Sequence, residues 1–154
     1  MREIVAYPAR AVDLYFAYGS NLAVSRLRKR VPSAHPVGRA QLSGHQLTFD
    51  KRGQDGSGKA NIAPRDRFST WGALYQFEAS SWALLDTFEP GYERLRVEVT
   101  SARGEVESAG TYRAIESVSG LLPRGWYKQL IADGAREHAL PEEYLAFLDA
   151  IRAG

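Results

Sequence analysis

The sequence contains no cysteine, which excludes disulfide bonds, thiolate metal sites and a cysteine nucleophile. It also contains no apolar run close to the roughly 20 residues that a membrane-spanning helix needs. Its first residues, MREIVAYPARAVDLYF, carry Arg and Glu early and lack the uninterrupted apolar stretch of a secretory leader. We therefore expect a cytoplasmic protein that does not enter a membrane.

Histidine is scarce, and the patterns of several common sites are missing. The histidines are His35, His45 and His138. None lies three or four residues from another, so no helix carries a histidine pair with metal-ligand spacing. Residues 19–21 lack the second glycine of the hydrolase elbow G-x-S-x-G, and the glycine-rich segment 51–59 lacks phosphate-loop spacing. The sequence therefore predicts no metal site and offers no support for a serine–histidine–acid triad.

Neither sign of charge is in excess, since 20 basic and 18 acidic residues leave a net charge of +2. The 154 residues are 44% hydrophobic and 25% charged, which is typical of a globular protein. This length predicts a single domain over residues 1–154, with residues 1–12 as a candidate peripheral extension. The one basic run, from Arg26 to Arg30, is typical of a solvated helix face. We expect no nucleic-acid binding, and a nucleic-acid-binding protein that uses this run is kept as an alternative.

The pattern of apolar residues predicts about seven short strands and four helices. The strands are expected at residues 14–18, 37–42, 46–50, 60–63, 70–77, 92–100 and 107–113. The helices are expected at residues 22–31, 80–88, 123–137 and 141–151, with Ser20 or Asn21 capping the first and Ser80 or Ser81 the second. Few strands alternate with helices. This order favours an α+β fold with a mixed or antiparallel sheet, closed into a small β-barrel with flanking helices.

The segment YFAYGSN, residues 15–21, runs from a strand into a glycine and then toward a helix. Gly19 permits a tight turn and close approach of a ligand to the backbone. The amides of Ser20, Asn21 and Leu22 are expected to point outward at a helix N-terminus, where they suit a carboxylate or an oxyanion. Taken alone, a plain strand–turn–helix with a good cap is the simpler interpretation of this segment.

A second notable segment is LLDTFEPGYERLR, residues 84–96. Asp86 and Glu89 lie three residues apart at the end of a predicted helix, and Glu89 is followed by Pro90 and Gly91. Its aromatic neighbours in the sequence are Trp82, Phe88 and Tyr92. An aromatic pocket at this corner would raise the pKa of Glu89 toward neutrality, as a proton shuttle requires. Taken alone, an exposed carboxylate beside a turn is again the simpler interpretation.

Together, five segments in order resemble the gamma-glutamylcyclotransferase-like (AIG2-like) family. They are YFAYGSN, TWGALYQF, LLDTFEPGY, GTYRA and YKQLIADGAREHALPEEYLAFL. The resemblance covers residues 14–151. The glutathione-specific branch is less similar, because it typically reads YGSL where Asn21 stands here. The resemblance implies a small barrel and a cofactor-free enzyme, in which the α-amine of a γ-glutamyl group attacks its own γ-carbonyl. The products are 5-oxoproline and a free amine or amino acid.

The resemblance also implies roles for particular residues. The loop of Tyr18, Gly19, Ser20 and Asn21, with the Leu22 amide, holds the glutamyl group, and Glu89 is the acid and base. Aromatic residues around the pocket are Tyr92, Tyr112 and Tyr127. The family often reads Glu-Gly where this chain has Glu89-Pro90-Gly91, and the loop before Tyr92 is short. The implied partner is a small γ-glutamyl compound, bound by a monomer or homodimer.

Two further interpretations stay open at this point. A non-catalytic module of the same fold would bind a γ-glutamyl metabolite without converting it. A protein-binding surface would use the apolar stripe of Trp126, Tyr127, Leu130 and Ile131, although core packing explains that stripe more simply. The sequence does not identify the amine that leaves.

Overall fold

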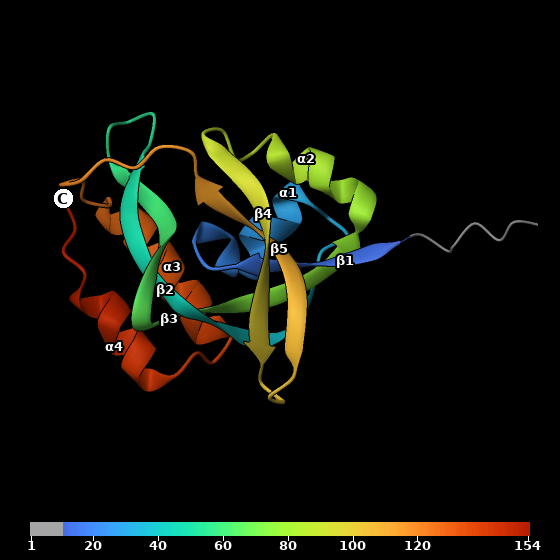
Figure 1. The fold of residues 1–154 in the computed structure, drawn as a ribbon. Coiled ribbons are helices and arrows are strands. Elements are labelled where there is room, and N and C mark those ends of the chain that lie inside the picture. The colour runs from blue at the N-terminus through green and yellow to red at the C-terminus, as the bar shows by residue number, and fades with distance from the viewer. Residues whose placement is uncertain (1–10) are drawn as a thin grey trace, which may run out of the picture.

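The computed structural model describes residues 11–154, and a closed barrel of five strands forms its centre (Figure 1). The strands are β1 (Val12–Ala17), β2 (His35–Arg52), β3 (Gly58–Glu78), β4 (Tyr92–Ser101) and β5 (Val106–Ala114). Their order around the barrel is β1-β3-β2-β4-β5. Every pairing is antiparallel except that of β5 with β1, where Tyr15 lies opposite Gly110 in parallel. The predicted α+β fold with a small mixed barrel is confirmed.

The prediction of seven short strands was wrong, because β2 and β3 each run through two of the predicted segments. The apparent break in β2 is a bulge at Gly44, whose φ is +75°. There the register passes from Ser43 opposite Ser69 directly to His45 opposite Pro64. A bulge bends a strand without ending it, and it changes which residues face inward. Its sequence pattern therefore resembles two strands separated by a turn.

The helices lie near their predicted positions but start differently. They are the 3₁₀ turn η1 (Ser20–Leu22), α1 (Val24–Arg30), the 3₁₀ turn η2 (Ala79–Ser81), α2 (Trp82–Asp86), α3 (Gly125–Glu137) and α4 (Glu142–Ala150). The predicted cap of the first helix is wrong, because Ala23 rather than Ser20 or Asn21 precedes α1. Ser20 and Asn21 belong to the 3₁₀ turn instead. Ser81 does stand at the N-cap of α2, as predicted, but its side chain makes no capping bond. Among the described residues, no helix is both long and apolar enough to span a bilayer.

The two ends of the chain differ from expectation in small ways. Residues 1–10 of the expected extension lie outside the described residues, but Val12 already belongs to β1 and pairs with Glu78. In the C-terminal stripe, Tyr127 and Ile131 are buried in the core while Trp126 is 59% exposed. Core packing therefore accounts for most of that stripe.

Helix α3 holds the turn η1 against the barrel. Leu22 in this turn is fully buried, and its carbonyl oxygen accepts a hydrogen bond from the Tyr75 hydroxyl at 3.0 Å. His138 Nε2, just beyond α3, lies 2.7 Å from the same oxygen. Because β1 leads directly into η1, these contacts fix the position of the backbone that follows Tyr18.

We expect Gly134→Ala to destabilise the protein by about 1–3 kcal/mol, the usual cost of overpacking a core. A Cβ at Gly134 would lie 2.7 Å from Leu22 Cβ and 2.8 Å from the Ala23 amide nitrogen, so α3 must move away from η1. Gly125→Ala is the matched control on the same helix, since a Cβ there meets nothing within 4 Å. Thermal unfolding of both variants tests this, and equal melting temperatures would contradict the close packing.

Candidate active site

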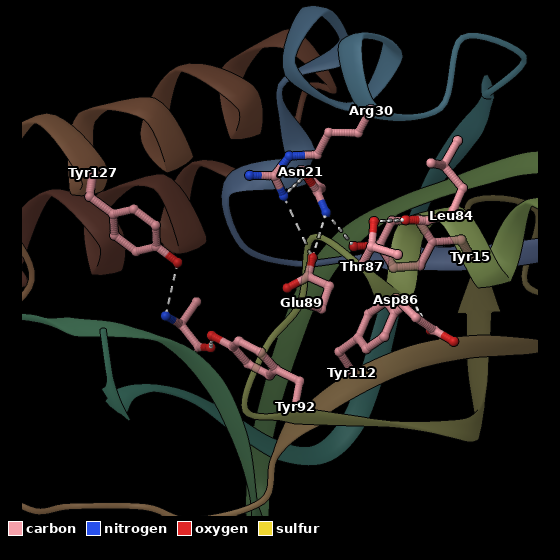
Figure 2. Close-up of polar contacts among 11 residues, drawn as sticks. Tyr15, Asn21, Arg30, Leu84, Asp86, Thr87, Glu89, Tyr92, Tyr112 and Tyr127 are labelled. Carbon is pink, nitrogen blue, oxygen red and sulfur yellow. Dashed lines mark hydrogen bonds and ion pairs between the residues drawn. The ribbon is translucent and has the colours of Figure 1, made fainter. Parts of the chain in front are cut away.

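Four parts of the chain meet at one end of the barrel and enclose a narrow pocket (Figure 2). They are the end of β1 with η1, the start of β3, the corner between α2 and β4, and α3. The pocket is lined by Tyr15, Tyr18, Gly19, Ser20, Asn21, Ala60, Glu89, Tyr92 and Tyr127. We call it the inner pocket. Its volume of about 30 Å³ has room for one water-sized group.

Glu89 reaches the inner pocket because the chain turns sharply after α2. Its amide donates to the Asp86 carbonyl at 3.0 Å, and the Tyr92 amide donates to the Glu89 carbonyl at 3.2 Å. Gly91, with φ of +84°, takes the left-handed conformation that closes this turn. The Glu89 side chain is only 14% exposed. The predicted helix-to-strand corner thus directs a carboxylate inward rather than into solvent.

The Glu89 carboxylate is held by Asn21 and Arg30, as Figure 2 shows. Asn21 Nδ2 donates to Glu89 Oε1 at 3.0 Å and to the Tyr15 hydroxyl at 3.0 Å. Arg30 Nη1 donates to Asn21 Oδ1 at 3.2 Å and lies 3.7 Å from Glu89 Oε1. Because a guanidinium only donates hydrogen bonds, Arg30 fixes the Asn21 amide with its NH₂ group toward Glu89. Within the described residues both of these contacts with Glu89 use Oε1, and Oε2 takes part in neither.

Burial raises the pKa of Glu89 to about 7, while the charge of Arg30 and the hydrogen bond from Asn21 act in the opposite direction. The carboxyl therefore exchanges protons near neutral pH. Of the aromatic residues expected around Glu89, two do not line the inner pocket. Trp82 packs in the core against Phe77, with ring centroids 4.8 Å apart, and Phe88 lies under the Arg30 guanidinium.

Two tyrosines are joined through one residue of β3. The Ala60 amide donates to the Tyr127 hydroxyl at 3.0 Å, and the Tyr92 hydroxyl donates to the Ala60 carbonyl at 2.7 Å. Burial raises the pKa of Tyr127 to about 12 and that of Tyr92 further. Both phenols therefore stay protonated near neutral pH and shape the pocket without acting as bases. Short as it is, the loop after Glu89 still places Tyr92 on the inner pocket.

Tyr18 lines the inner pocket, and its hydroxyl donates to the Tyr112 carbonyl at 2.6 Å. Tyr112 itself lies outside this pocket. Its hydroxyl donates to Asp86 Oδ1 at 2.6 Å, and the ring borders a neighbouring hollow that Glu89 also reaches. Tyr112 therefore lines this neighbouring hollow together with Glu89 rather than the inner pocket.

The predicted row of free amides needs one correction. The Leu22 amide donates to the Gly19 carbonyl at 3.0 Å and the Ala23 amide to the Ser20 carbonyl at 3.3 Å, so the 3₁₀ turn uses both. The Leu22 side chain is fully buried away from the pocket lining. Leu22 is thus a core residue, whereas the amides of Ser20 and Asn21 are not used by the turn.

A wider cavity of about 380 Å³ opens beyond the inner pocket and shares Ser20, Glu89, Tyr92 and Tyr127 with it. We call it the outer cavity. Its basic side chains are Arg26, Arg30, Lys51 and Lys59. The basic run of α1 is thereby divided, because Arg26 and Arg30 face the cavity while the Arg28 guanidinium donates to the Ala34 carbonyl.

Across residues 11–154, no group of three or more His, Asp or Glu side chains is placed to hold a metal ion.

Three functional neighbours of Glu89 were missed by sequence reasoning. Tyr15 lies in the segment YFAYGSN, but no motif in that segment indicates that its hydroxyl accepts a hydrogen bond from Asn21. The sequence indicates Arg30 only as part of a basic run. Its spacing of nine residues from Asn21 carries no motif, because a turn and a helix together produce the contact. Ala60 acts through its backbone, which no side-chain pattern reveals.

Comparison with known proteins agrees with this arrangement. Residues 69–148 match the model of the AIG2-like family. The chain is 32% identical over 156 residues to a gamma-glutamylcyclotransferase of Homo sapiens, covering 96% of this chain and 82% of that protein. A solved structure titled gamma-glutamyl cyclotransferase superposes with a TM-score of 0.87 at 31% identity, over 93% of this chain and 89% of that one.

A solved yeast gamma-glutamyl cyclotransferase described as specific to glutathione is more distant. It superposes with a TM-score of 0.58 at 15% identity, over 90% of this chain and 94% of that one, and it shares the fold. The family match and the identity to curated relatives extend over most of the described residues. The chain belongs to the AIG2-like family.

Proposed function

We propose that the chain is a gamma-glutamylcyclotransferase with Glu89 as its acid and base. The observation that carries this proposal is the Glu89 carboxyl, which is nearly buried, held by Asn21 and Arg30, and directed into a pocket walled by Gly19. Relatives that cover most of this chain carry the same enzyme name. The substrate is a small γ-glutamyl compound, and the products are 5-oxoproline and a free amine.

The reaction needs no nucleophile from the protein. The substrate's α-amine attacks its own γ-carbonyl carbon, which forms the C–N bond of the five-membered ring. The bond between that carbon and the leaving nitrogen then breaks. Held in the right shape, such a ring closure benefits from effective molarities of about 10⁵ M or more. The absence of cysteine is therefore no obstacle to this chemistry.

Glu89 moves one proton during the reaction. The α-ammonium group, whose ordinary pKa is about 8, first loses one proton to solvent and becomes the attacking amine. The Glu89 carboxylate takes a second proton from this nitrogen as the ring C–N bond forms and gives it to the leaving nitrogen as the old C–N bond breaks, so the lactam nitrogen keeps one hydrogen. A pKa of about 7 suits both directions of this transfer. The amides of Ser20 and Asn21 are the donors best placed to stabilise the oxyanion on the γ-carbonyl oxygen. At 30 Å³ the inner pocket is too small for a whole glutamyl group, which must extend into the outer cavity.

The direct test is release of 5-oxoproline from purified protein supplied with γ-glutamyl-alanine, γ-glutamyl-glutamine and γ-glutamyl-butylamide. We expect release from at least one of them, without an added cofactor. Isothermal titration with the same compounds identifies the alternative. Binding without release would indicate a non-catalytic module of this fold. If the protein neither bound nor converted any of the compounds, the proposed function would be rejected.

Replacing Arg30 by Met is expected to move the acidic limb of the pH profile of kcat/KM upward by about one unit. The reaction begins with unprotonated Glu89, so kcat/KM rises as pH passes the pKa of Glu89. The charge of Arg30 lowers that pKa, and its loss therefore shifts the limb to higher pH. Arg30→Lys keeps a charge and is expected to shift it less. Lys29→Met, on the exposed side of α1, is the control. An unmoved limb in Arg30→Met would contradict this role.

A further inference from the structure

The outer cavity contains three cations that have no carboxylate oxygen within salt-bridge distance among residues 11–154: Arg26, Lys51 and Lys59. Its fourth cation, Arg30, is engaged with Asn21 and Glu89. The remaining acid on the wall, Asp55, accepts hydrogen bonds from Ser57 and is paired with Arg124 at 3.5 Å. The cavity therefore carries an excess of positive charge that the fold itself does not neutralise.

Lys51 and Lys59 stand directly opposite each other on β2 and β3. Like charges in this cross-strand position destabilise a sheet, so folding alone does not explain the pair. Glycines leave space for both side chains. A Cβ on Gly91 would lie 2.7 Å from Lys51 Cε, and a Cβ on Gly53 would lie 2.6 Å from Lys59 Cε. Both lysines are thus packed along the cavity wall rather than extended into solvent.

The ammonium groups of these lysines lie over rings of the reaction site. Lys59 Nζ is 4.4 Å from the centroid of the Tyr127 ring, and Lys51 Nζ is 5.2 Å from that of Tyr92. Tyr92 and Tyr127 also line the inner pocket. The positive charge is therefore next to the place where the leaving nitrogen must emerge.

Arg26 adds the third cation from α1. Its Nε atom is buried and has no hydrogen-bond partner among the described residues. An unpaired buried donor is costly, and most such atoms in proteins find a partner. Burial lowers the pKa of both Arg26 and Lys59, and repulsion from neighbouring cations adds to each shift. The charges of Glu89 and Asp55 act in the opposite direction, and the net shift of both pKa values is still downward. An anion in the cavity would satisfy the donor and relieve the repulsion.

On the basis of the proposed function, we infer that the outer cavity selects γ-glutamyl derivatives of acidic amino acids. Such a substrate carries three carboxylates: that of the glutamyl group, and the α- and side-chain carboxylates of the leaving aspartate or glutamate. These match the three unpaired cations in number. The bonds that form and break are those described above, and the leaving nitrogen departs as the amine of the acidic amino acid. A γ-glutamyl amine without a carboxylate leaves two of the cations unpaired.

The test compares γ-glutamyl-glutamate with γ-glutamyl-glutamine, which has nearly the same shape but one charge fewer. We expect kcat/KM to be about tenfold higher for the glutamate compound, since charge-assisted hydrogen bonds are stronger than neutral ones. The double variant Lys51→Met, Lys59→Met is expected to bring the ratio close to one. The double variant also removes a like-charge pair, so its melting temperature should be equal to or above that of the wild type. Lys29→Met, which changes a lysine outside the cavity, should keep the wild-type ratio.

The possible failures are distinct. Equal kcat/KM for the two compounds in the wild type overturns the inference and leaves the proposed function standing. A preference for the glutamate compound that survives in the double variant also overturns it, because the lysine pair from which the selectivity is argued would then not bind the side-chain carboxylate. Absence of 5-oxoproline from every compound overturns both.

Discussion

Replacing Glu89 by Gln is expected to reduce kcat for 5-oxoproline release by about 10²–10⁴-fold, the usual contribution of general acid–base catalysis. Glutamine keeps the size of the side chain, and its carbonyl oxygen still accepts the hydrogen bond from Asn21 Nδ2. It cannot carry a proton from the attacking amine to the leaving nitrogen. Binding of a γ-glutamyl compound should therefore survive, and titration calorimetry separates the two effects.

The pH dependence of the free energy of unfolding provides a control for Glu89→Gln, and the raised pKa of Glu89 determines the sign of the expected change. Folding raises this pKa from 4.5 to about 7, so the folded protein holds a proton that the unfolded chain releases between these values. The contribution of Glu89 to the free energy of unfolding has its maximum below about pH 4.5 and decreases as the pH rises toward 7. Glu89→Gln removes this loss, so the variant should be as stable as the wild type at pH 5 and more stable at pH 8.

These two measurements decide the role of Glu89 together. An inactive variant that is also unstable at pH 8 would indicate a structural residue. A stable variant with unchanged turnover would remove Glu89 from the reaction. Asp86→Asn is the matched acid control on the same corner, because its carboxylate is 40% exposed and pairs with Arg94 outside the inner pocket. We expect Asp86→Asn to keep most of the activity.

The corner that carries Glu89 could be predicted from local signals in the sequence, whereas the role of Glu89 came from the resemblance to the AIG2-like family. A helix, a proline and a left-handed glycine in succession define the corner that turns the carboxylate inward. The same holds for Gly19, whose neighbours form a strand and a turn. Positions that depend on distant pairing were not predictable in this way. The contact of Arg30 with Glu89 joins residues 59 apart in sequence, and that of Ala60 with Tyr127 joins residues 67 apart.

The errors have physical causes too. Leu22 was assigned a free amide because a helix N-terminus leaves its first amides unpaired. Here a 3₁₀ turn precedes α1 and uses that amide. The long strands β2 and β3 were divided in the prediction because bulges disturb the alternation of inward and outward residues. Neither a 3₁₀ turn nor a bulge has a sequence pattern distinct from an ordinary turn.

Gly19→Val is expected to lower kcat/KM by about 100-fold, since small displacements of a reacting site have effects of this order. A Cβ at Gly19 would lie 3.0 Å from Ala60 Cβ and 3.8 Å from the Tyr127 hydroxyl. The two extra methyl groups of valine would fill a pocket of only 30 Å³ and push Ala60 outward. Because the Ala60 backbone holds both Tyr92 and Tyr127, that movement would open the wall opposite Glu89.

Gly19→Ala separates the loss of space from the loss of glycine itself. Alanine introduces the same Cβ without the two methyl groups, and the φ of −112° at Gly19 is outside the left-handed region. We therefore expect a graded loss, small for alanine and large for valine. Gly125→Val is the control away from the pocket, because a Cβ there meets nothing within 4 Å. If calorimetric titration gave Gly19→Val the wild-type affinity for a γ-glutamyl compound, the turn after β1 would not be where the glutamyl group lies.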